Sequence, residues 1–593
     1  MGFAVFPDCD GAVTAARSVG GPRTWAHPSG RPWLTSDLPP DAVTVAEAGD
    51  TRLAVIGCCP VQELRRHAER VHDLDDVDRV ARRLPGSFHL VASVGGRVLV
   101  RGTASGLRLV FHTRVGGVTV AADRADVLAR LAGACVDERQ LAVRLLFPVP
   151  HPLADVPLWR GVRQLDPAHH LVLERDGSTR SGRWWYPPEP ELSLAAAAEP
   201  ARRALVDAVE ARTAAGGVVS CDLSGGLDST SICFLAARGG ASVIAFTWPT
   251  LDEADDDLRW ARRAAAHLPG LRHDVLPADR SPLVYAGLRE ADDVVDEPTI
   301  GVVDRARVLA RLPELARSGA RLHLTGIGGD HVAWGSDAYY HTLMRTRPFL
   351  ALHRLRGYRS LFRWTRQSTV RALLDHRSYG AWLADSADEL RAPVPDSATT
   401  GLGWGMPPRA FPWVTDEAVD LAREALLAAA PSARPLGPTR GLHSDLEQIR
   451  ATNRIVRQWE QITARQGLPI SSPFMDDRVI EAFLAVRPEE RITPFDYKPV
   501  LKAAMRGVVP DECLERSTKA EATLDAAQGL REHRGDLLAL WEDSRLAELG
   551  LVDKRRLADL AVRPSTPDLR EATFYAAVGC EVWLRALRRP AVL

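Results

Sequence analysis

Ser224-Gly225-Gly226-Leu227-Asp228-Ser229 stands between a short apolar run and a segment with helical spacing, and it is the most informative part of this sequence. Glycines let the backbone approach an anion, while successive N–H groups, serine hydroxyls and a helix N-terminus all favour negative charge. Asp228 is left to hold a magnesium ion. A turn that only caps a helix is the alternative, but the complete six-residue pattern favours a pyrophosphate site.

The segments around this turn alternate between strand and helix patterns. In order they are a helix at 192–214, a strand at 216–223, a strand at Ser242–Thr247, a helix at Asp256–His267 and a strand at Leu322–Thr325. This alternation predicts an α/β fold with a parallel sheet, whose ligands bind at the carboxyl ends of the strands. Residues from about 340 to 590 are predicted to be mostly helical.

The first 185 residues have a different pattern. Short Val/Leu/Ala runs are broken by Gly, Pro and Asp, and Gly95-Gly96 joins two of them. Such runs are typical of antiparallel strands and hairpins, so a layered α+β domain is predicted. The pattern ends in the proline-rich stretch 184–190, which suggests two domains, 1–188 and 189–593.

The overall composition excludes several classes of function. The formal net charge is −1, so no global basic field favours nucleic acid. No apolar segment reaches membrane-spanning length without charge or proline, and the N-terminus has no signal-like pattern, so we expect a cytoplasmic protein with no membrane partner. The eight cysteines have no metal-binding spacing.

Lysine is rare in this sequence. Only four of the 75 basic residues are lysine, and three of them, Lys498, Lys502 and Lys519, lie within 498–519. A GC-rich coding bias explains the rarity, and these residues could be chance remnants. The alternative, which we favour for Lys498 and Lys519, is that a phosphate or a developing oxyanion needs a compact ammonium there.

Four segments in this order resemble the asparagine synthetase superfamily. Ser224–Ser229 resembles its ATP-pyrophosphatase motif and Leu324–Asp330 its second Gly-rich loop, while Ser472–Asp476 resembles its Pro-Phe-Leu-Asp signature and Lys498–Lys519 its closing segment. The resemblance implies ATP and magnesium as cofactors. It assigns nucleotide binding to Leu223, Ser224, Gly225, Gly226, Asp228, Ser229, Gly326, Gly328, Gly329 and Asp330, magnesium to Asp228 and Asp330, and catalysis to Lys498 and Lys519.

The chemistry that the resemblance implies has two steps. A substrate carboxylate attacks the α-phosphorus of ATP, and an amine then displaces AMP. Lys498 would hold the β- or γ-phosphate, and Lys519 would stabilise charge that develops in both steps. Asp330 could instead cap a helix, and Asp476 could be a structural salt-bridge partner.

The source of the amine is the next question. Glutamine-dependent asparagine synthetases have a nucleophilic cysteine after the initiator methionine, where this sequence has Gly2, and Cys9 is not terminal. Leu84–Phe88 and Arg101–Gly106 still resemble elements of the class II glutaminase (Ntn-type) fold, so we expect a degenerate glutaminase domain. Ile327 stands where relatives have glutamate or tyrosine and transfers no proton. His331, Glu297 and His273 are candidate bases, each equally a structural residue.

An insertion at about 340–440 bears on the size of the substrate. Its first part is basic and aromatic, with Arg345, Arg347, Arg354, Arg356, Tyr358, Arg359, Phe362, Arg363, Trp364, Arg366 and Arg371. This is either a solvated face or a groove for an extended peptide. Together with Gly2, it resembles the lasso peptide cyclases, which join an Asp or Glu side chain of a peptide to its N-terminal amine.

That resemblance implies a precursor core peptide as substrate, with a leader peptidase and a leader-recognition protein as partners. The alternatives are a β-lactam synthetase-like ligase for small molecules and a catalytically silent scaffold that binds nucleotide or peptide. An ATP-pyrophosphatase that modifies tRNA is disfavoured by the neutral charge and the lack of a CxxC pair.

Overall fold

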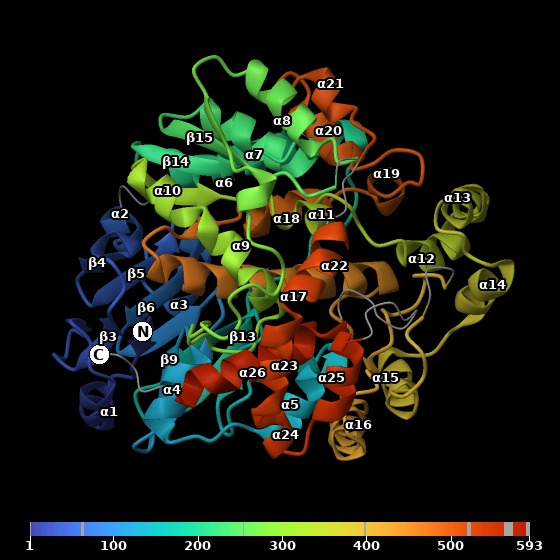
Figure 1. Ribbon diagram of the computed structural model, residues 1–593. Coiled ribbons are helices and arrows are strands. Elements are labelled where there is room, and N and C mark those ends of the chain that lie inside the picture. Colours follow the sequence, from blue (N-terminus) through green and yellow to red (C-terminus); the bar gives the residue numbers. More distant parts are fainter. Residues whose placement is uncertain are drawn as a thin grey trace.

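The computed structural model describes residues 2–60, 64–252, 254–395, 399–518, 523–562 and 573–588. Figure 1 shows a β-rich N-terminal part, a parallel sheet covered by helices, and a large helical C-terminal part from which α13 (Pro348–Leu361) and α14 (Arg366–Leu374) project. No helix among these residues is long and apolar enough to cross a membrane.

The N-terminal part contains two six-stranded antiparallel sheets packed face to face. One has the order β11 (Arg163–Gln164), β8 (Phe111–Val115), β9 (Val118–Ala122), β1 (Phe3–Val5), β3 (Pro32–Ser36) and β2 (Arg23–Ala26). The other has the order β13 (Thr179–Arg183), β12 (His169–Leu173), β7 (Arg97–Arg101), β6 (Ser87–Val94), β5 (Thr51–Cys58) and β4 (Val43–Ala48).

Apolar side chains explain the layers of this part. A buried cluster that includes Val5, Leu34 and Val91 lies between the two sheets. The outer faces are covered by α1 (Gly11–Val19) and α4 (Ala125–Ala132) on one side, and by α2 (Leu64–Ala68) and α3 (Leu74–Ala81) on the other. The arrangement agrees with the predicted layered α+β architecture.

The predicted parallel sheet is confirmed, with two strands more than the sequence indicated. Its order is β16 (Arg272–Val275), β15 (Ser242–Thr247), β14 (Val218–Asp222), β17 (Ala320–Leu324) and β19 (Ile470–Ser471). The helices α6 (Leu194–Thr213), α7 (Leu227–Ala237) and α8 (Asp257–Ala266) contribute to one buried apolar core with it. The strands β14 and β17 are neighbours, so the segments that follow them start side by side.

The C-terminal part is largely helical, as predicted. After α9 (Arg305–Ala310) and α10 (Leu312–Arg317), which precede β17, the helices are α11 (Gly329–Val332), α12 (Tyr339–Thr346), α13 (Pro348–Leu361), α14 (Arg366–Leu374), α15 (Tyr379–Asp388), α16 (Asp416–Ala429), α17 (Arg440–Arg465), α18 (Asp477–Leu484), α19 (Pro488–Arg491), α20 (Pro499–Met505), α21 (Asp511–Leu514), α22 (Thr523–Glu532), α23 (Arg534–Glu542), α24 (Arg545–Glu548), α25 (Lys554–Val562) and α26 (Tyr575–Arg588).

The two parts of the chain share one of these apolar cores. Leu141 and Val143 of α5 (Glu138–Arg144) are buried together with Trp413 and with Trp583 of α26. In addition, β10 (Leu146–Phe147) pairs with β18 (Arg409–Ala410), which lies in the insertion. The N-terminal part is therefore fixed to the helices that surround the parallel sheet.

Candidate active site

The glycine-rich loop after β14 has a conformation that only glycine suits. Gly225 has a φ of +78°, and a Cβ there would lie 2.6 Å from Cβ of Trp260 in α8. The hydroxyl of Ser229 accepts a hydrogen bond from the N–H of Ser224 (3.1 Å) and lies 2.9 Å from the Ser224 hydroxyl. The two hydroxyls thus join the loop to the first turn of α7, which begins at Leu227.

The second glycine-rich loop, after β17, packs directly on the first. A Cβ on Gly329 would lie 2.3 Å from Cγ of Asp228, and a Cβ on Gly326 would lie 2.7 Å from the backbone nitrogen of Ser229. Any larger residue at these positions would push the loops apart. The structure therefore brings together the two loops to which the sequence assigned the nucleotide.

Lys498 joins the carboxylates of the two loops. Its Nζ lies 2.5 Å from Oδ2 of Asp228 and 2.8 Å from Oδ1 of Asp330, and its side chain is 1% exposed. Burial disfavours the ammonium, but the two carboxylates outweigh burial, so the pKa of Lys498 is raised. Lys498 also has a φ of +51°, an unusual backbone conformation for a residue with a side chain.

The two aspartates suit a magnesium ion. Both carboxylates approach a single positive group, and carboxylate oxygens are the ligands that magnesium prefers. Tyr497 donates its hydroxyl proton to Oδ1 of Asp330 at 2.7 Å and packs against Trp334 with ring centroids 5.2 Å apart. The sequence did not single out Tyr497, although it directly precedes the rare Lys498.

The segment Ser472–Asp476, which contains Pro-Phe-Met-Asp, packs against the second loop. It follows β19, and the Ser472 hydroxyl donates to the carbonyl of Ile327 at 2.5 Å. The side chain of Met475 fills the space beside Gly328, where a Cβ would lie 2.2 Å from its Cε. Asp476 forms two hydrogen bonds, 2.7 and 2.8 Å, with the fully buried guanidinium of Arg212 in α6. Asp476 is thus a structural salt-bridge partner, the role that the sequence analysis named for it.

Lys519 lies outside the described residues, but the segment that leads to it is fixed beside the phosphate loop. Arg516 donates to Oδ1 of Asp256 at 2.6 Å and to Oδ1 of Asp257 at 2.5 Å, and Thr518 donates to Asp256 at 2.9 Å. Asp257 begins α8, whose first turn contacts Gly225. We call these contacts the clasp. Sequence reasoning missed it because its two sides lie about 260 residues apart in the chain.

The three candidate bases lie in different surroundings. His331 directly follows Asp330, is partly exposed, and its Nδ1 is 3.3 Å from Oε1 of Gln448 in α17. His273 in β16 hydrogen-bonds the Thr247 hydroxyl at 2.8 Å, and burial lowers its pKa. Only His331 adjoins a residue of the two loops.

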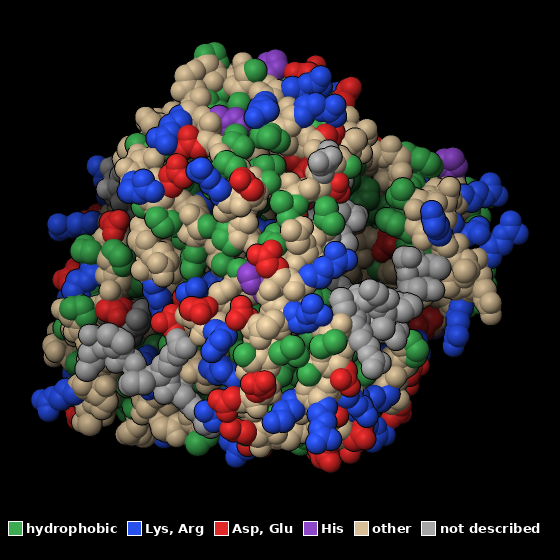
Figure 2. All heavy atoms as spheres, viewed as in Figure 1, with side chains coloured by type: hydrophobic (Ala, Val, Ile, Leu, Met, Phe, Trp, Pro, Cys, Tyr) green, Lys and Arg blue, Asp and Glu red, His purple; other side chains and the backbone are tan. Residues whose placement is uncertain are grey.

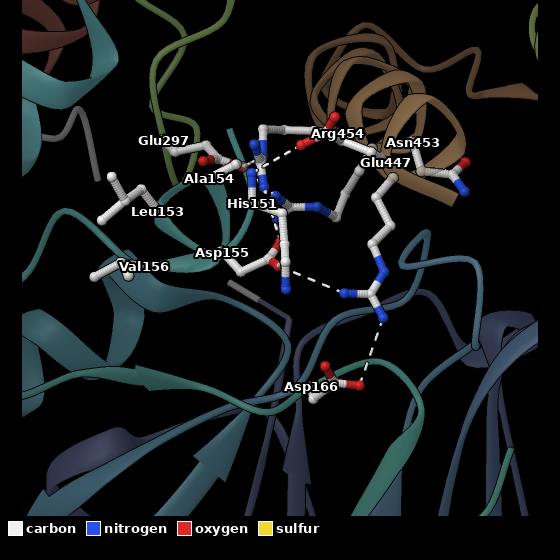
Figure 3. A network of polar contacts seen from close by, with 12 residues as sticks. His151, Leu153, Ala154, Asp155, Val156, Asp166, Glu297, Glu447, Asn453 and Arg454 are labelled. Carbon is white, nitrogen blue, oxygen red and sulfur yellow. Dashed lines mark hydrogen bonds and ion pairs between the residues drawn. The ribbon is translucent and has the colours of Figure 1, made fainter. Parts of the chain in front are cut away.

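Glu297 belongs to a buried ion-pair network instead. Its carboxylate lies 2.6 Å from Arg457, 3.1 Å from Arg454 and 3.3 Å from Arg144. Burial alone would raise its pKa, but the surrounding arginines outweigh burial and lower it. Figure 3 shows this carboxylate beside α17 together with His151 and Asp155 of the N-terminal part. Glu297 is therefore a permanent counter-ion and not a base.

Ile327 of the second glycine-rich loop is 38% exposed, and both its N–H and its carbonyl are hydrogen-bonded. Its N–H donates to the Thr325 hydroxyl at 3.3 Å, and its carbonyl accepts from Ser472. The position that carries an acid or a phenol in relatives thus presents an apolar side chain beside Asp330.

A side chain at position 2 would require the Asp123 carboxylate to move. A Cβ on Gly2 would lie 2.1 Å from both carboxylate oxygens of Asp123, which accepts the N–H of Phe3 at 2.9 Å. Burial raises the pKa of Asp123 to about 6. Burial also raises the pKa of the Cys58 thiol, and it raises that of Cys59 to about 12, so both thiols stay protonated at neutral pH.

Comparisons with known proteins agree on one family. A family model described as asparagine synthase matches residues 201–585. Two proteins named "Putative asparagine synthetase (glutamine-hydrolyzing)", from Mycobacterium bovis and Mycobacterium tuberculosis, are each 27% identical over 439 residues, which is 69% of this chain. The chain spans 62% of the length of these curated relatives.

Solved structures give a weaker likeness. Glutamine phosphoribosylpyrophosphate amidotransferase from B. subtilis, complexed with ADP and GMP, is 12% identical and covers 47% of this chain and 63% of its own. The TM-score is 0.17, which is too low to support a conclusion about fold or activity.

Proposed function

This chain belongs to the asparagine synthase family, and we propose that it is an ATP- and magnesium-dependent ligase that forms an amide within one peptide. In this proposal it activates an Asp or Glu side chain of a leader-cleaved precursor peptide and joins it to the N-terminal amine of the same peptide, as lasso peptide cyclases do. A leader peptidase and a leader-recognition protein would prepare the substrate.

The observation that carries this proposal is the collision between position 2 and Asp123. Glutamine hydrolysis in this family needs a nucleophilic side chain at the start of the sandwich, and the carboxylate of Asp123 occupies that space. The thiols of Cys58 and Cys59, which lie at the end of β5 in the other sheet, are held protonated by burial. The amine must then arrive with the substrate, and a peptide that carries both groups supplies it.

The residues of the site would divide the activation step among them. The N–H groups of the two glycine-rich loops and the Ser224 and Ser229 hydroxyls would bind phosphate oxygens. Asp228 and Asp330 would hold magnesium, which supplies positive charge to the phosphates when bound. Lys498 is buried beside both carboxylates, which supports the proposal that it binds a phosphate oxygen of the leaving pyrophosphate.

The second step needs a proton acceptor for the attacking amine. The amine nitrogen bonds to the activated carbonyl carbon, the bond to AMP breaks, and one amine proton leaves. His331 is the candidate that adjoins Asp330, while Ile327 in the same loop can accept no proton. Lys519 remains the predicted group that stabilises the charge on the oxygen.

The test uses the full chain with ATP, magnesium and a precursor peptide encoded beside it, already cleaved at its leader. We expect AMP formation and loss of one water from the peptide by mass spectrometry. The same peptide with an acetylated N-terminus should still support exchange of pyrophosphate into ATP but should lose no water.

The other outcomes separate the alternatives. AMP formation with small amino-acid substrates but no dehydrated peptide would replace the cyclase by a β-lactam synthetase-like ligase. An Asp228→Asn variant provides the inactive control. Equal AMP formation by this variant and the wild type would show that Asp228 does not hold the magnesium ion. If no substrate leads to AMP, the alternative of a binding scaffold would be favoured.

A further inference from the structure

The outer face of α13 exposes apolar side chains to solvent. Ala351, Leu355 and Tyr358 face inward and are buried. On the opposite side, at helical spacing, lie Phe349, which is 88% exposed, and Leu352, which is 49% exposed. A phenylalanine that is so exposed, beside a second apolar side chain, is unusual on a surface that binds nothing.

This face is connected to the active site by the loop that carries Lys498. The ring of His353, on the same face of α13, lies 5.3 Å from the ring of Phe495. Gly357 leaves room for this loop, since a Cβ there would lie 2.6 Å from Cγ of Pro494. The loop then reaches Tyr497, whose hydroxyl contacts Asp330. Phe349, Leu352, His353, Phe495 and Tyr497 are all exposed on α13 and on the loop that packs against it, and we call these five residues the outer strip.

The surroundings of the outer strip are strongly basic. Residues 339–374 contain eight arginines and no aspartate or glutamate. Arg347 has a carboxylate partner, Glu489, at 3.0 Å. Within the described residues, no ion pair forms at Arg356, which lies on the face of the strip, or at Arg363, Arg366 and Arg371. Figure 2 shows Lys and Arg side chains gathered on the projecting lobe at the right, with apolar side chains beside them.

We propose that the outer strip and the arginines of α13 and α14 bind a peptide chain that carries both carboxylates and large apolar side chains. Charge complementarity selects such a chain over a neutral one, and the apolar strip selects it over a simple polyanion. Since the strip ends at Tyr497, whose hydroxyl contacts Asp330, a peptide bound along it has one end at the phosphate loops. The identity of this peptide as the substrate rests on the proposed function, but its binding does not.

The test measures binding without turnover. The probe is a fluorescein-labelled peptide in which Asp and Glu alternate with Leu and Phe, and its twin has Asn and Gln in place of the acids. Fluorescence anisotropy with the full chain, without ATP, should show that the acidic peptide binds about tenfold more tightly and that added salt weakens it. Equal affinity for both peptides would overturn the proposal.

Two sets of variants locate the surface. Arg356→Glu with Arg366→Glu should weaken binding of the acidic peptide about tenfold, and Phe349→Ser with Leu352→Ser should weaken it several-fold. All four side chains are exposed, so the fold should tolerate these changes. The control is Arg555→Glu, an exposed arginine on α25 that should leave the affinity unchanged. Wild-type affinity in both sets, or an equal loss in the control, would contradict the proposal.

Three further results separate this inference from the proposed function and from other occupants. Asp228→Asn should bind the acidic peptide as tightly as the wild type does. The wild type should bind this peptide even if it cyclises no peptide. A working cyclase whose KM for its peptide is unchanged by the two sets would refute the inference alone. If an oligonucleotide competes equally well for the wild type and for the variant with Phe349→Ser and Leu352→Ser, the surface is a polyanion site. An increase of molecular mass in light scattering would indicate self-association.

Discussion

The ammonium of Lys498 lies 2.5 Å from a carboxylate oxygen of Asp228, and the lysine is buried at the point where the two glycine-rich loops meet. The second carboxylate, that of Asp330, approaches the same ammonium at 2.8 Å. One lysine therefore neutralises both residues to which magnesium is assigned. Its surroundings make the stability of the protein depend on the charges of the active site.

Lys498→Met should abolish AMP formation and lower stability. Two carboxylates would then face each other without a cation, which we expect to lower the free energy of unfolding by about 2 to 3 kcal/mol, toward the lower end for a broken buried pair because Asp330 is half exposed. Urea unfolding with and without magnesium measures this. Lys502→Met, which breaks the more exposed pair with Asp496, is the control. A loss of stability that magnesium does not reduce would contradict the assigned metal site.

Tyr497→Phe should raise the KM for ATP while the fold is retained. The change removes only the hydroxyl that donates to Asp330, and a hydrogen bond to a charged group contributes about 1.5 kcal/mol or somewhat more. We therefore expect an increase of about tenfold in KM, measured from pyrophosphate release. An unchanged KM would mean that Asp330 does not need this partner when nucleotide is bound.

Arg516→Lys should lower kcat about tenfold and leave the KM for ATP nearly unchanged. The guanidinium donates through Nη2 to Asp256 and Asp257 and through Nε to the Thr518 hydroxyl, and the single nitrogen of an ammonium cannot reproduce both sets of contacts. The clasp would act by positioning the segment that carries Lys519, so Arg516→Lys should add little to the loss caused by Lys519→Arg. Arg531→Lys on the exposed surface of α22 is the control. Fully additive effects of the two changes would separate the clasp from Lys519.

Glu447→Gln should alter the pH dependence of stability. Burial raises the pKa of Glu447 from 4.5 to about 7, although the N–H of His151, which donates to it at 2.8 Å, opposes the shift. The folded protein binds this proton more tightly than the unfolded chain, so stability falls as the pH rises from about 4.5 to about 7. The group should then cost roughly 3 kcal/mol at pH 8.

Glutamine at this position has no proton to lose and keeps an oxygen that accepts from His151. The variant should therefore gain stability relative to the wild type between pH 5 and pH 8. Chemical denaturation at both pH values checks this expectation. The same difference between the two proteins at both values would show that the carboxyl of Glu447 does not titrate in this range.

Gly2→Ala should destabilise the sandwich by about 1 to 3 kcal/mol, because the new methyl group overlaps the Asp123 carboxylate. Asp123→Ala in addition should restore part of that loss, so the two changes should be non-additive. Thermal unfolding of both single variants and the double variant tests this. Gly2→Cys should release no ammonia from glutamine. Hydrolysis by that variant would show that the space is available after all.

The sequence predicted the parts of the fold that local signals mark. Alternating strand and helix patterns around Ser224–Ser229 identified β14, β15 and β17, and the glycines placed both loops at strand ends. The strand β16 was missed because Arg272–Val275 is a polar edge strand, and β19 because it has two residues. The rarity of lysine pointed to Lys498.

Relationships between distant segments were beyond such signals. Nothing near Arg516 in the sequence names Asp256 and Asp257 as its partners, and nothing near Asp476 names Arg212. The role of Glu297 was open for the same reason, since the arginines that surround it come from α5 and α17. Packing of the whole chain decides these pairs, and a short motif does not contain that information.

The most direct test of the account follows one oxygen atom. The precursor peptide is made with ¹⁸O in the side-chain carboxylate of its acceptor residue and incubated with the chain, ATP and magnesium. We predict that AMP gains one ¹⁸O and that the peptide loses one water, retaining a single ¹⁸O in the new amide, with both changes absent in Asp228→Asn. Dehydrated peptide with unlabelled AMP would contradict activation of the carboxylate by adenylation, and labelled AMP with only unclosed peptide would contradict closure by the peptide's own amine.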